Sequence, residues 1–146
     1  MQGGPESARI LTMKLTAVAL TILVATSAHA EWKPQYADAS QATQDWYASA
    51  QVTDAAFPRL GFRGCCVSSE VVRTKFKVSK IGGKDEWSYL DPVSQTWKIV
   101  PSDIVHWGES APDGRPTLFV LSDHWADVFH LPHGTPSCFY PAAGGL

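Results

Sequence analysis

Three cysteines constrain the fold of this chain more than any other feature. Cys65 and Cys66 are adjacent, and Cys138 lies near the C-terminus. Adjacent cysteines are poor partners for each other, because Cα atoms across a trans peptide lie about 3.8 Å apart, below the ~4.4 Å that ordinary disulfides need. In an oxidising compartment we therefore expect Cys138 to form a disulfide with either Cys65 or Cys66. Such a bond would tie the C-terminal segment to the middle of the chain.

One of the two adjacent cysteines is then left outside the disulfide, and three interpretations of it stay open. It is a buried thiol that acts as a small apolar residue, or it forms an intermolecular bridge in a disulfide-linked dimer. Alternatively, it attacks the neighbouring disulfide in thiol–disulfide exchange, which requires an exposed thiol of lowered pKa. No Cys-x-x-Cys motif is present.

The first 30 residues predict export. Lys14 precedes a charge-free run of twelve residues, Leu15 to Thr26, and the small-residue triplet Ala28-His29-Ala30 ends the segment. This is the pattern of a secretory signal peptide that is cleaved after Ala30, with Met13 as a candidate initiator. A membrane-spanning helix needs about 20 apolar residues. We therefore expect a periplasmic or secreted protein without a stable membrane anchor.

The sequence divides into a signal peptide (1–30), an N-terminal helix and linker (31–63) and a β-rich domain (64–146). The part after residue 30 has 116 residues, enough for one small domain, and a net charge of −3. Its densest basic run, 73–80, alternates charged with apolar residues, as a half-exposed strand does. Nucleic acid is therefore not an expected partner.

Hydrophobic periodicity predicts one early helix followed by short strands. The helix is expected within 38–52, where Ala42, Trp46 and Ala50 share a face. The expected strands are 71–79, 86–91, 96–101, 103–110, 116–123, 125–131 and 138–141. Pro112-Asp113-Gly114 predicts a hairpin turn between 103–110 and 116–123. The expected fold is mainly β with one N-terminal helix (a small α+β fold), arranged as an antiparallel sheet or a partly open barrel.

Three segments carry a resemblance to a known family. They are GCCVSSEVV (64–72), TWKIVPSDIVHWGESAPDGRPTLFV (96–120) and SCFYPAAGG (137–145). Their paired cysteines, Trp-x-x-Val-Pro turn and terminal Cys-Phe-x-Pro resemble a family of small exported alphaproteobacterial proteins of unknown function. The resemblance implies export and a compact β-rich domain, and it lends no catalytic residue. The segment 123–137 looks longer here than the corresponding link in that family.

A cluster of histidines is the candidate metal site. His124, His130 and His133 lie within ten residues of one another and alternate with Asp123 and Asp127. Imidazole and carboxylate groups together suit Zn²⁺ or Cu²⁺, although this spacing matches no strong zinc motif. No other cofactor is expected.

A catalytic constellation is not visible in the sequence. Ser110 lies near His106 and Glu109, but Gly-x-Ser-x-Pro is not the nucleophile elbow Gly-x-Ser-x-Gly. On a strand, His106 and Glu109 would face opposite sides and could not pair without a bulge. The sequence thus gives no support for an enzyme.

Six tryptophans lie after residue 30, and we expect at least four of them in the core. Trp87 and Trp97 flank a predicted turn and are the candidates for a binding face. We therefore expect a non-enzymatic extracytoplasmic module that binds a protein or envelope component. The alternatives are a periplasmic Zn- or Cu-binding protein and a thiol-redox protein.

Overall fold

The computed structural model describes residues 39–144. The predicted signal peptide and Met13 lie outside these residues. The elements in chain order are α2 (Gln41–Ser49), α3 (Phe57–Leu60), α4 (Cys65–Ser68), β1 (Ser69–Val72), β2 (Phe76–Ile81), β3 (Lys84–Leu90), β4 (Trp97–Ile99), the 3₁₀ helix η1 (Ser102–Ile104), β5 (Thr117–Leu121), α5 (Asp123–Phe129) and β6 (Pro136–Tyr140). The described chain is β-rich, with two small antiparallel sheets and several short helices.

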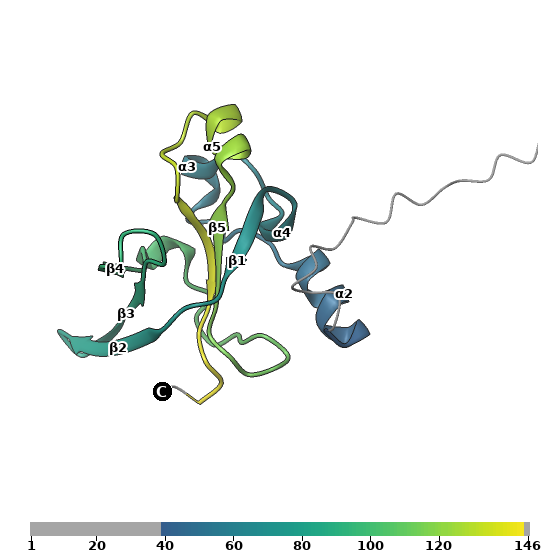
Figure 1. Cartoon of the computed structure of the whole chain (residues 1–146). Helices are drawn as coiled ribbons and strands as arrows, with labels where there is room; N and C mark the ends of the chain where they lie inside the picture. Colours follow the sequence, from purple (N-terminus) through teal and green to yellow (C-terminus); the bar gives the residue numbers. More distant parts are fainter. Residues whose placement is uncertain (1–38, 145–146) are drawn as a thin grey trace, which may run out of the picture. The chain divides into compact units, whose positions relative to one another are not determined.

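The first sheet has the order β1-β5-β6, with β5 in the centre (Figure 1). β5 pairs with β1 through Val71 opposite Phe119, and with β6 through Leu118 opposite Phe139. Leu118 and Phe119 point to opposite faces, and both are fully buried. A strand whose side chains are apolar on both faces must be packed against other residues on both faces. The central position of β5 also pairs its backbone with a neighbouring strand at each edge.

The second sheet is a meander with the order β2-β3-β4. Its first hairpin turns through Gly82 and Gly83, which both have positive φ, so that Ile81 pairs directly with Lys84. Two-residue loops with positive φ at both positions match the twist of antiparallel strands, and glycine adopts them without steric cost. β4 is short, and all three of its residues are exposed.

The two sheets are connected by residues 73–75, where the predicted single strand 71–79 is interrupted. β1 ends at Val72 and β2 begins at Phe76, so the prediction of one continuous strand is wrong. At the crossing, the Thr74 hydroxyl donates a hydrogen bond to the Leu90 carbonyl, and the Leu90 N–H donates to the Lys75 carbonyl. These bonds anchor the connection to β3, in the second sheet.

Phe139 of β6 joins the two sheets in one core. Its ring centroid lies 5.5 Å from that of Phe76 and 5.3 Å from that of Trp87, both in the second sheet. Cys138 and Tyr140, on the other face of β6, are also buried. The strands therefore divide between two packed sheets instead of forming one sheet or a partly open barrel.

The predicted hairpin between 103–110 and 116–123 is wrong, although its turn is present. Gly114 has positive φ and its N–H donates to the Ala111 carbonyl, as expected for the turn. However, β5 takes β1 and β6 as partners, and η1 replaces the start of the predicted strand 103–110. Val105 alone makes a parallel bridge, with Phe139. Gly108, in a positive-φ turn, ends the extended backbone soon after this bridge.

The segment 125–131 was predicted as a strand and forms α5 instead. Trp125 and Phe129 are four residues apart, and their rings stack with centroids 5.7 Å apart, as helical spacing allows. Ala126, in the middle of this helix, is fully buried. His130 follows it in the left-handed conformation that commonly ends helices.

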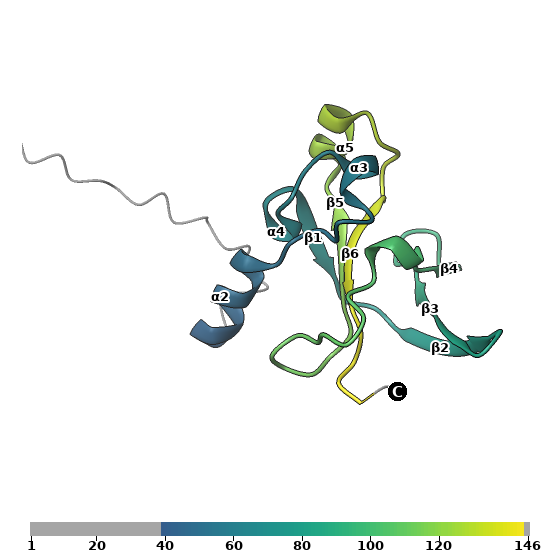
Figure 2. The same cartoon turned by 180° about the vertical axis from the view of Figure 1, so that it is seen from behind.

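The residues before the first sheet are part of the same core. α2 begins after Ser40, whose hydroxyl accepts a hydrogen bond from the Thr43 N–H, and Tyr47 is its buried residue. Figure 2 shows α2 beside α4. In the predicted linker, Val52 and Leu60 are buried. The linker is thus packed structure that supports the β-rich part.

Candidate functional site

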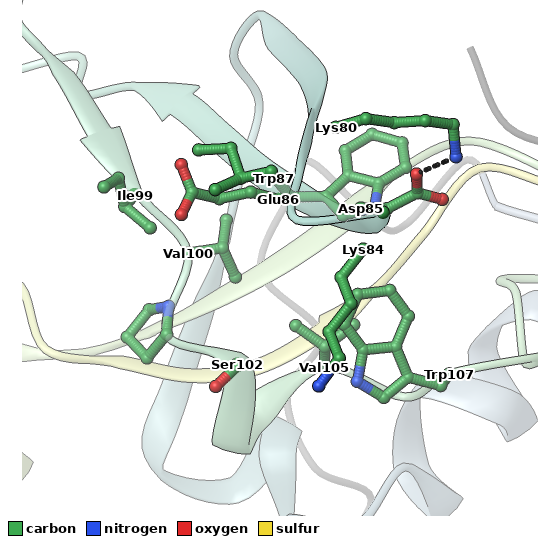
Figure 3. A pocket seen from close by; sticks show the side chains of 13 residues that line it. Lys80, Lys84, Asp85, Glu86, Trp87, Ile99, Val100, Ser102, Val105 and Trp107 are labelled. Carbon is green, nitrogen blue, oxygen red and sulfur yellow. Dashed lines mark hydrogen bonds and ion pairs between the residues drawn. The ribbon is translucent and has the colours of Figure 1, made fainter.

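A groove lies where β3 extends beyond β4. Its volume is about 820 Å³, and it is bordered by the β2–β3 hairpin, by β4 and by residues 100–107 (Figure 3). Ile81, Ile99 and Trp107 line it, and each keeps more than half of its surface exposed. Lys84 and Glu86 add charges of both signs, and Lys80 and Asp85 form an ion pair at the rim. The groove thus combines apolar surface with a charged border.

Within residues 39–144, no other strand covers the edge of β3 beside this groove. β4 pairs only with Ser88, Tyr89 and Leu90, so Lys84–Glu86 have a neighbour on the β2 side alone. Alternate residues of an antiparallel strand point their backbone groups to opposite edges. The Val100 N–H donates to the Trp87 carbonyl, so Trp87 faces the β4 edge. Asp85, two residues earlier, therefore directs its N–H and C=O to the same, uncovered edge.

The structure places Trp87 and Trp97 on opposite faces of the second sheet. Trp97 is paired with Leu90 and shares its face, whereas Trp87 is three residues away from Leu90 and points to the other side. Trp87 is 4% exposed and packs on Phe139, but its ring also lines the groove. Trp97 is 44% exposed, lies outside the groove lining and carries Lys77 over its ring, 4.3 Å from the centroid. The two residues do not form one binding face.

A disulfide joins Cys65, the first residue of α4, to Cys138 of β6. This selects Cys65 over Cys66 as the partner of Cys138. Both cysteines of the bond are fully buried, with Cα atoms 5.9 Å apart. Cys66 is partly buried, packs against the core and is not part of a disulfide.

His106 lies directly against this disulfide. One of its ring nitrogens is within 4.8 Å of both sulfur atoms. The ring stacks on Tyr140 with centroids 4.0 Å apart and planes inclined by 8°, and the backbone N–H of His106 donates to the Phe139 carbonyl. Burial lowers the pKa of His106, while the Glu109 carboxylate and the Gln51 backbone raise it. Burial also raises the pKa of Tyr140, to about 12.

His106 and Glu109 approach each other, contrary to the expectation that they face opposite sides of a strand. Their side chains lie 3.8 Å apart, from Nδ1 to Oε2. The reason is that residues 106–109 form a turn, in which the Glu109 N–H donates to the His106 carbonyl. Ser110 is exposed, and no hydrogen bond joins Ser110 to His106 among residues 39–144.

The predicted metal site is not assembled in the described part of the chain. His124 packs edge-on against Trp125, and His130 ends α5. His133 lies 2.8 Å from Asp127 and 3.5 Å from Asp123. These two carboxylates raise the pKa of His133. Among residues 39–144, the group whose ligand atoms converge closely enough for a metal is instead Cys65, His106 and Cys138.

The sequence did not indicate that Trp107 lines the groove or that His106 lies beside the disulfide. Trp107 was counted only among the tryptophans, and His106 was assigned to a strand. The convergence of residues 65, 106 and 138 depends on contacts between distant segments, which periodicity does not report. One part of this arrangement could be read from the sequence. Cys138 and Tyr140 are two residues apart on a predicted strand, so their side chains point to the same face.

Within residues 39–144, no helix has the length and apolar character needed to cross a membrane. Comparison with known proteins gives no family: no family model, no curated protein and no solved structure matches the chain. The resemblance to exported alphaproteobacterial proteins therefore stays a prediction.

Proposed function

We propose that this protein is a non-enzymatic extracytoplasmic module that binds an extended segment of a partner protein in the groove beside β3. The single observation that carries the proposal is the uncovered edge of β3 next to exposed apolar side chains. Extracytoplasmic location is supported by the predicted signal peptide and by the disulfide between two buried cysteines.

Strand addition is the recognition mode that this geometry favours. An extended peptide hydrogen-bonds to an open sheet edge through its main chain, and alternate side chains occupy neighbouring pockets. Here Asp85 offers one N–H and one C=O, while Ile99 and Trp107 offer apolar contact to the side chains of the peptide. Lys84 and Glu86, which form no ion pair with another described residue, suit a peptide that carries charges of both signs beside its apolar residues.

The test uses a library of short random peptides, selected on the full-length purified chain, with affinities measured by isothermal titration calorimetry. We expect the selected peptides to contain an apolar residue and to bind in extended form. Asp85→Pro removes the N–H that faces the open edge, and we expect it to weaken binding at least about tenfold, the effect of losing a well-placed hydrogen bond and its packing.

Two controls separate this mode from other contacts. Asp85→Ala removes the same carboxylate and keeps the N–H, so we expect nearly unchanged affinity. Trp107→Ala should abolish binding, whereas Trp97→Ala, an exposed tryptophan outside the groove, should preserve it. If no peptide is selected, or if Asp85→Pro binds as well as Asp85→Ala, the proposal is wrong.

A further inference from the structure

The atoms around the disulfide have the composition of a metal site. Cys65 opens α4, His106 follows η1, and Cys138 lies in the middle of β6. Two sulfur atoms and one imidazole nitrogen from these residues lie within 4.8 Å of one another. Thiolate and imidazole are the ligands that Zn²⁺ prefers, and sites with three protein ligands leave a fourth position for another ligand.

The imidazole of His106 is held in place and keeps an unused nitrogen. Stacking on Tyr140 fixes the plane of the ring, and the backbone hydrogen bond to Phe139 fixes the residue beside β6. Nε2 is buried and has no hydrogen-bond partner among the described residues. A buried ring nitrogen without a partner is costly in a folded protein unless it has a role. A metal coordinated through Nε2 would satisfy this nitrogen, and the 4.8 Å convergence with the sulfur atoms holds for one of the two ring nitrogens.

We propose that reduction of the Cys65–Cys138 disulfide creates a metal site in which Cys65, Cys138 and His106 bind a borderline or soft ion such as Zn²⁺. In the reduction, a dithiol gives two electrons and two protons to the disulfide and becomes a disulfide itself. Zn²⁺ then displaces the two protons from the Cys65 and Cys138 thiols. The disulfide and the metal therefore exclude each other, because each uses both sulfur atoms.

The charges and geometry of the site agree with this assignment. Two thiolates, one neutral imidazole and Zn²⁺ sum to zero charge, which suits a buried position where an isolated ion would be costly. Tetrahedral zinc holds two sulfur atoms roughly 3.8 Å apart, given Zn–S bonds of about 2.3 Å. After reduction the two sulfur atoms must move apart to about that distance, which requires side-chain rotation at Cys65 and Cys138. Cys66 lies outside the group of converging ligand atoms.

The experiment uses the full-length chain, reduced with a dithiol, freed of reductant without oxygen and titrated with Co²⁺ and then Zn²⁺. We expect one Co²⁺ per chain, a thiolate-to-cobalt charge-transfer band and displacement of Co²⁺ by Zn²⁺. The oxidised chain should give no such band. His106→Gln keeps much of the side-chain volume and should weaken Co²⁺ binding by at least about tenfold.

Matched variants give the controls. His133→Gln removes an exposed histidine, and Cys66→Ser removes the third thiol; neither should change the Co²⁺ affinity. The proposal is overturned if His106→Gln binds as wild type does, if the Cys65→Ser/Cys138→Ser chain keeps the band, or if no band forms.

Near-UV circular dichroism covers the case in which the reduced chain unfolds. Zn²⁺ should then restore the spectrum of the oxidised protein in wild type and not in His106→Gln. Metal binding without that recovery would show thiols chelating metal in an unfolded chain, and this result would also overturn the site. None of these readouts depends on peptide binding in the groove.

Discussion

β5 and β4 are both antiparallel strands, but four of the five residues of β5 are buried and all three residues of β4 are exposed. The same contrast extends to their sheets. The β1-β5-β6 sheet is tied to α4 by the disulfide and contains most of the largest fully buried side chains, whereas β2 and β4 are largely accessible. We therefore expect the first sheet to contribute most of the stability and the second sheet to contribute mainly exposed surface. Substitutions should separate these two roles.

The largest effect is expected at Phe139, where the sheets meet. Phe139→Ala removes a fully buried ring that contacts Phe76 and Trp87 of the second sheet. We expect the free energy of unfolding to fall by about 4 kcal/mol, because a buried aromatic is replaced by a cavity. Urea unfolding measures it. Trp97→Ala is the control at an exposed aromatic residue, and it should lower the free energy of unfolding by less than about 1 kcal/mol. If it lowers that free energy as much as Phe139→Ala does, the division of roles between the sheets is wrong.

Loss of the disulfide should have the next largest effect. Cys65→Ala/Cys138→Ala opens a link between residues 73 positions apart, and we expect a loss of about 3 kcal/mol, within the usual range for a native disulfide. Thermal unfolding of the oxidised proteins measures this difference. Cys66→Ala changes a cysteine of the same helix that is not in the bond and should lose much less. Comparable losses in both variants would mean that packing, not the covalent link, is responsible.

The dependence of stability on pH tests the environment of His106, which lies beside β6 of the first sheet. Burial lowers the pKa of His106 in the folded protein, so below the unfolded pKa of about 6.5 the unfolded chain binds the proton more readily. Stability contributed by this residue is therefore present above pH ~6.5 and lost as the pH falls. His106→Gln should flatten the loss of unfolding free energy between pH 7 and pH 5.

His133 provides a control of opposite sign. Its pKa is raised by Asp127 and Asp123, so its contribution is present at low pH and is lost as the pH rises through the raised pKa. His133→Gln should consequently steepen the acid destabilisation slightly. If both variants change the pH profile in the same direction, one of these environments has been misassigned.

The smallest effect is expected at the rim of the groove. The Lys80–Asp85 ion pair joins β2 to β3, but both side chains are substantially exposed. Lys80→Ala should change the free energy of unfolding by less than about 0.5 kcal/mol, because solvent and salt screen exposed ion pairs. Urea unfolding at low and high salt measures it. A loss above about 1 kcal/mol would show that the second sheet carries more stability than its exposure suggests.

Local patterns in the sequence predicted those parts of the fold that depend on neighbouring residues. Pro112-Asp113-Gly114 indicated a turn that is present. The adjacency of Cys65 and Cys66 excluded a bond between them and left Cys138 as the partner. Each of these inferences rests on backbone geometry within a few residues.

The failures concern the choice of distant partners. Nothing local reports that β5 pairs with β1 and β6 instead of with residues 103–110. The alternation in 71–79 is real, but it continues across a change of sheet at residues 73–75. Residues 125–131 were predicted as a strand, but Trp125 and Phe129 have the four-residue spacing of one helix face, which the strand prediction did not use.

The candidate sites likewise depend on contacts between distant segments that the sequence does not report. Trp97 is exposed, and its placement on the opposite face from Trp87 follows from the pairing of Leu90 with Trp97, which the sequence did not show. His106 gains its position beside the sulfur atoms only when α4, η1 and β6 meet.

The position of the disulfide also bears on proteolysis. The whole β2-β3-β4 sheet lies in sequence between Cys65 and Cys138, inside the covalent ring that the bond closes. A protease that cuts the exposed hairpin at Gly82-Gly83 would thus leave both fragments attached to each other. Only after reduction would the nicked molecule separate into two chains.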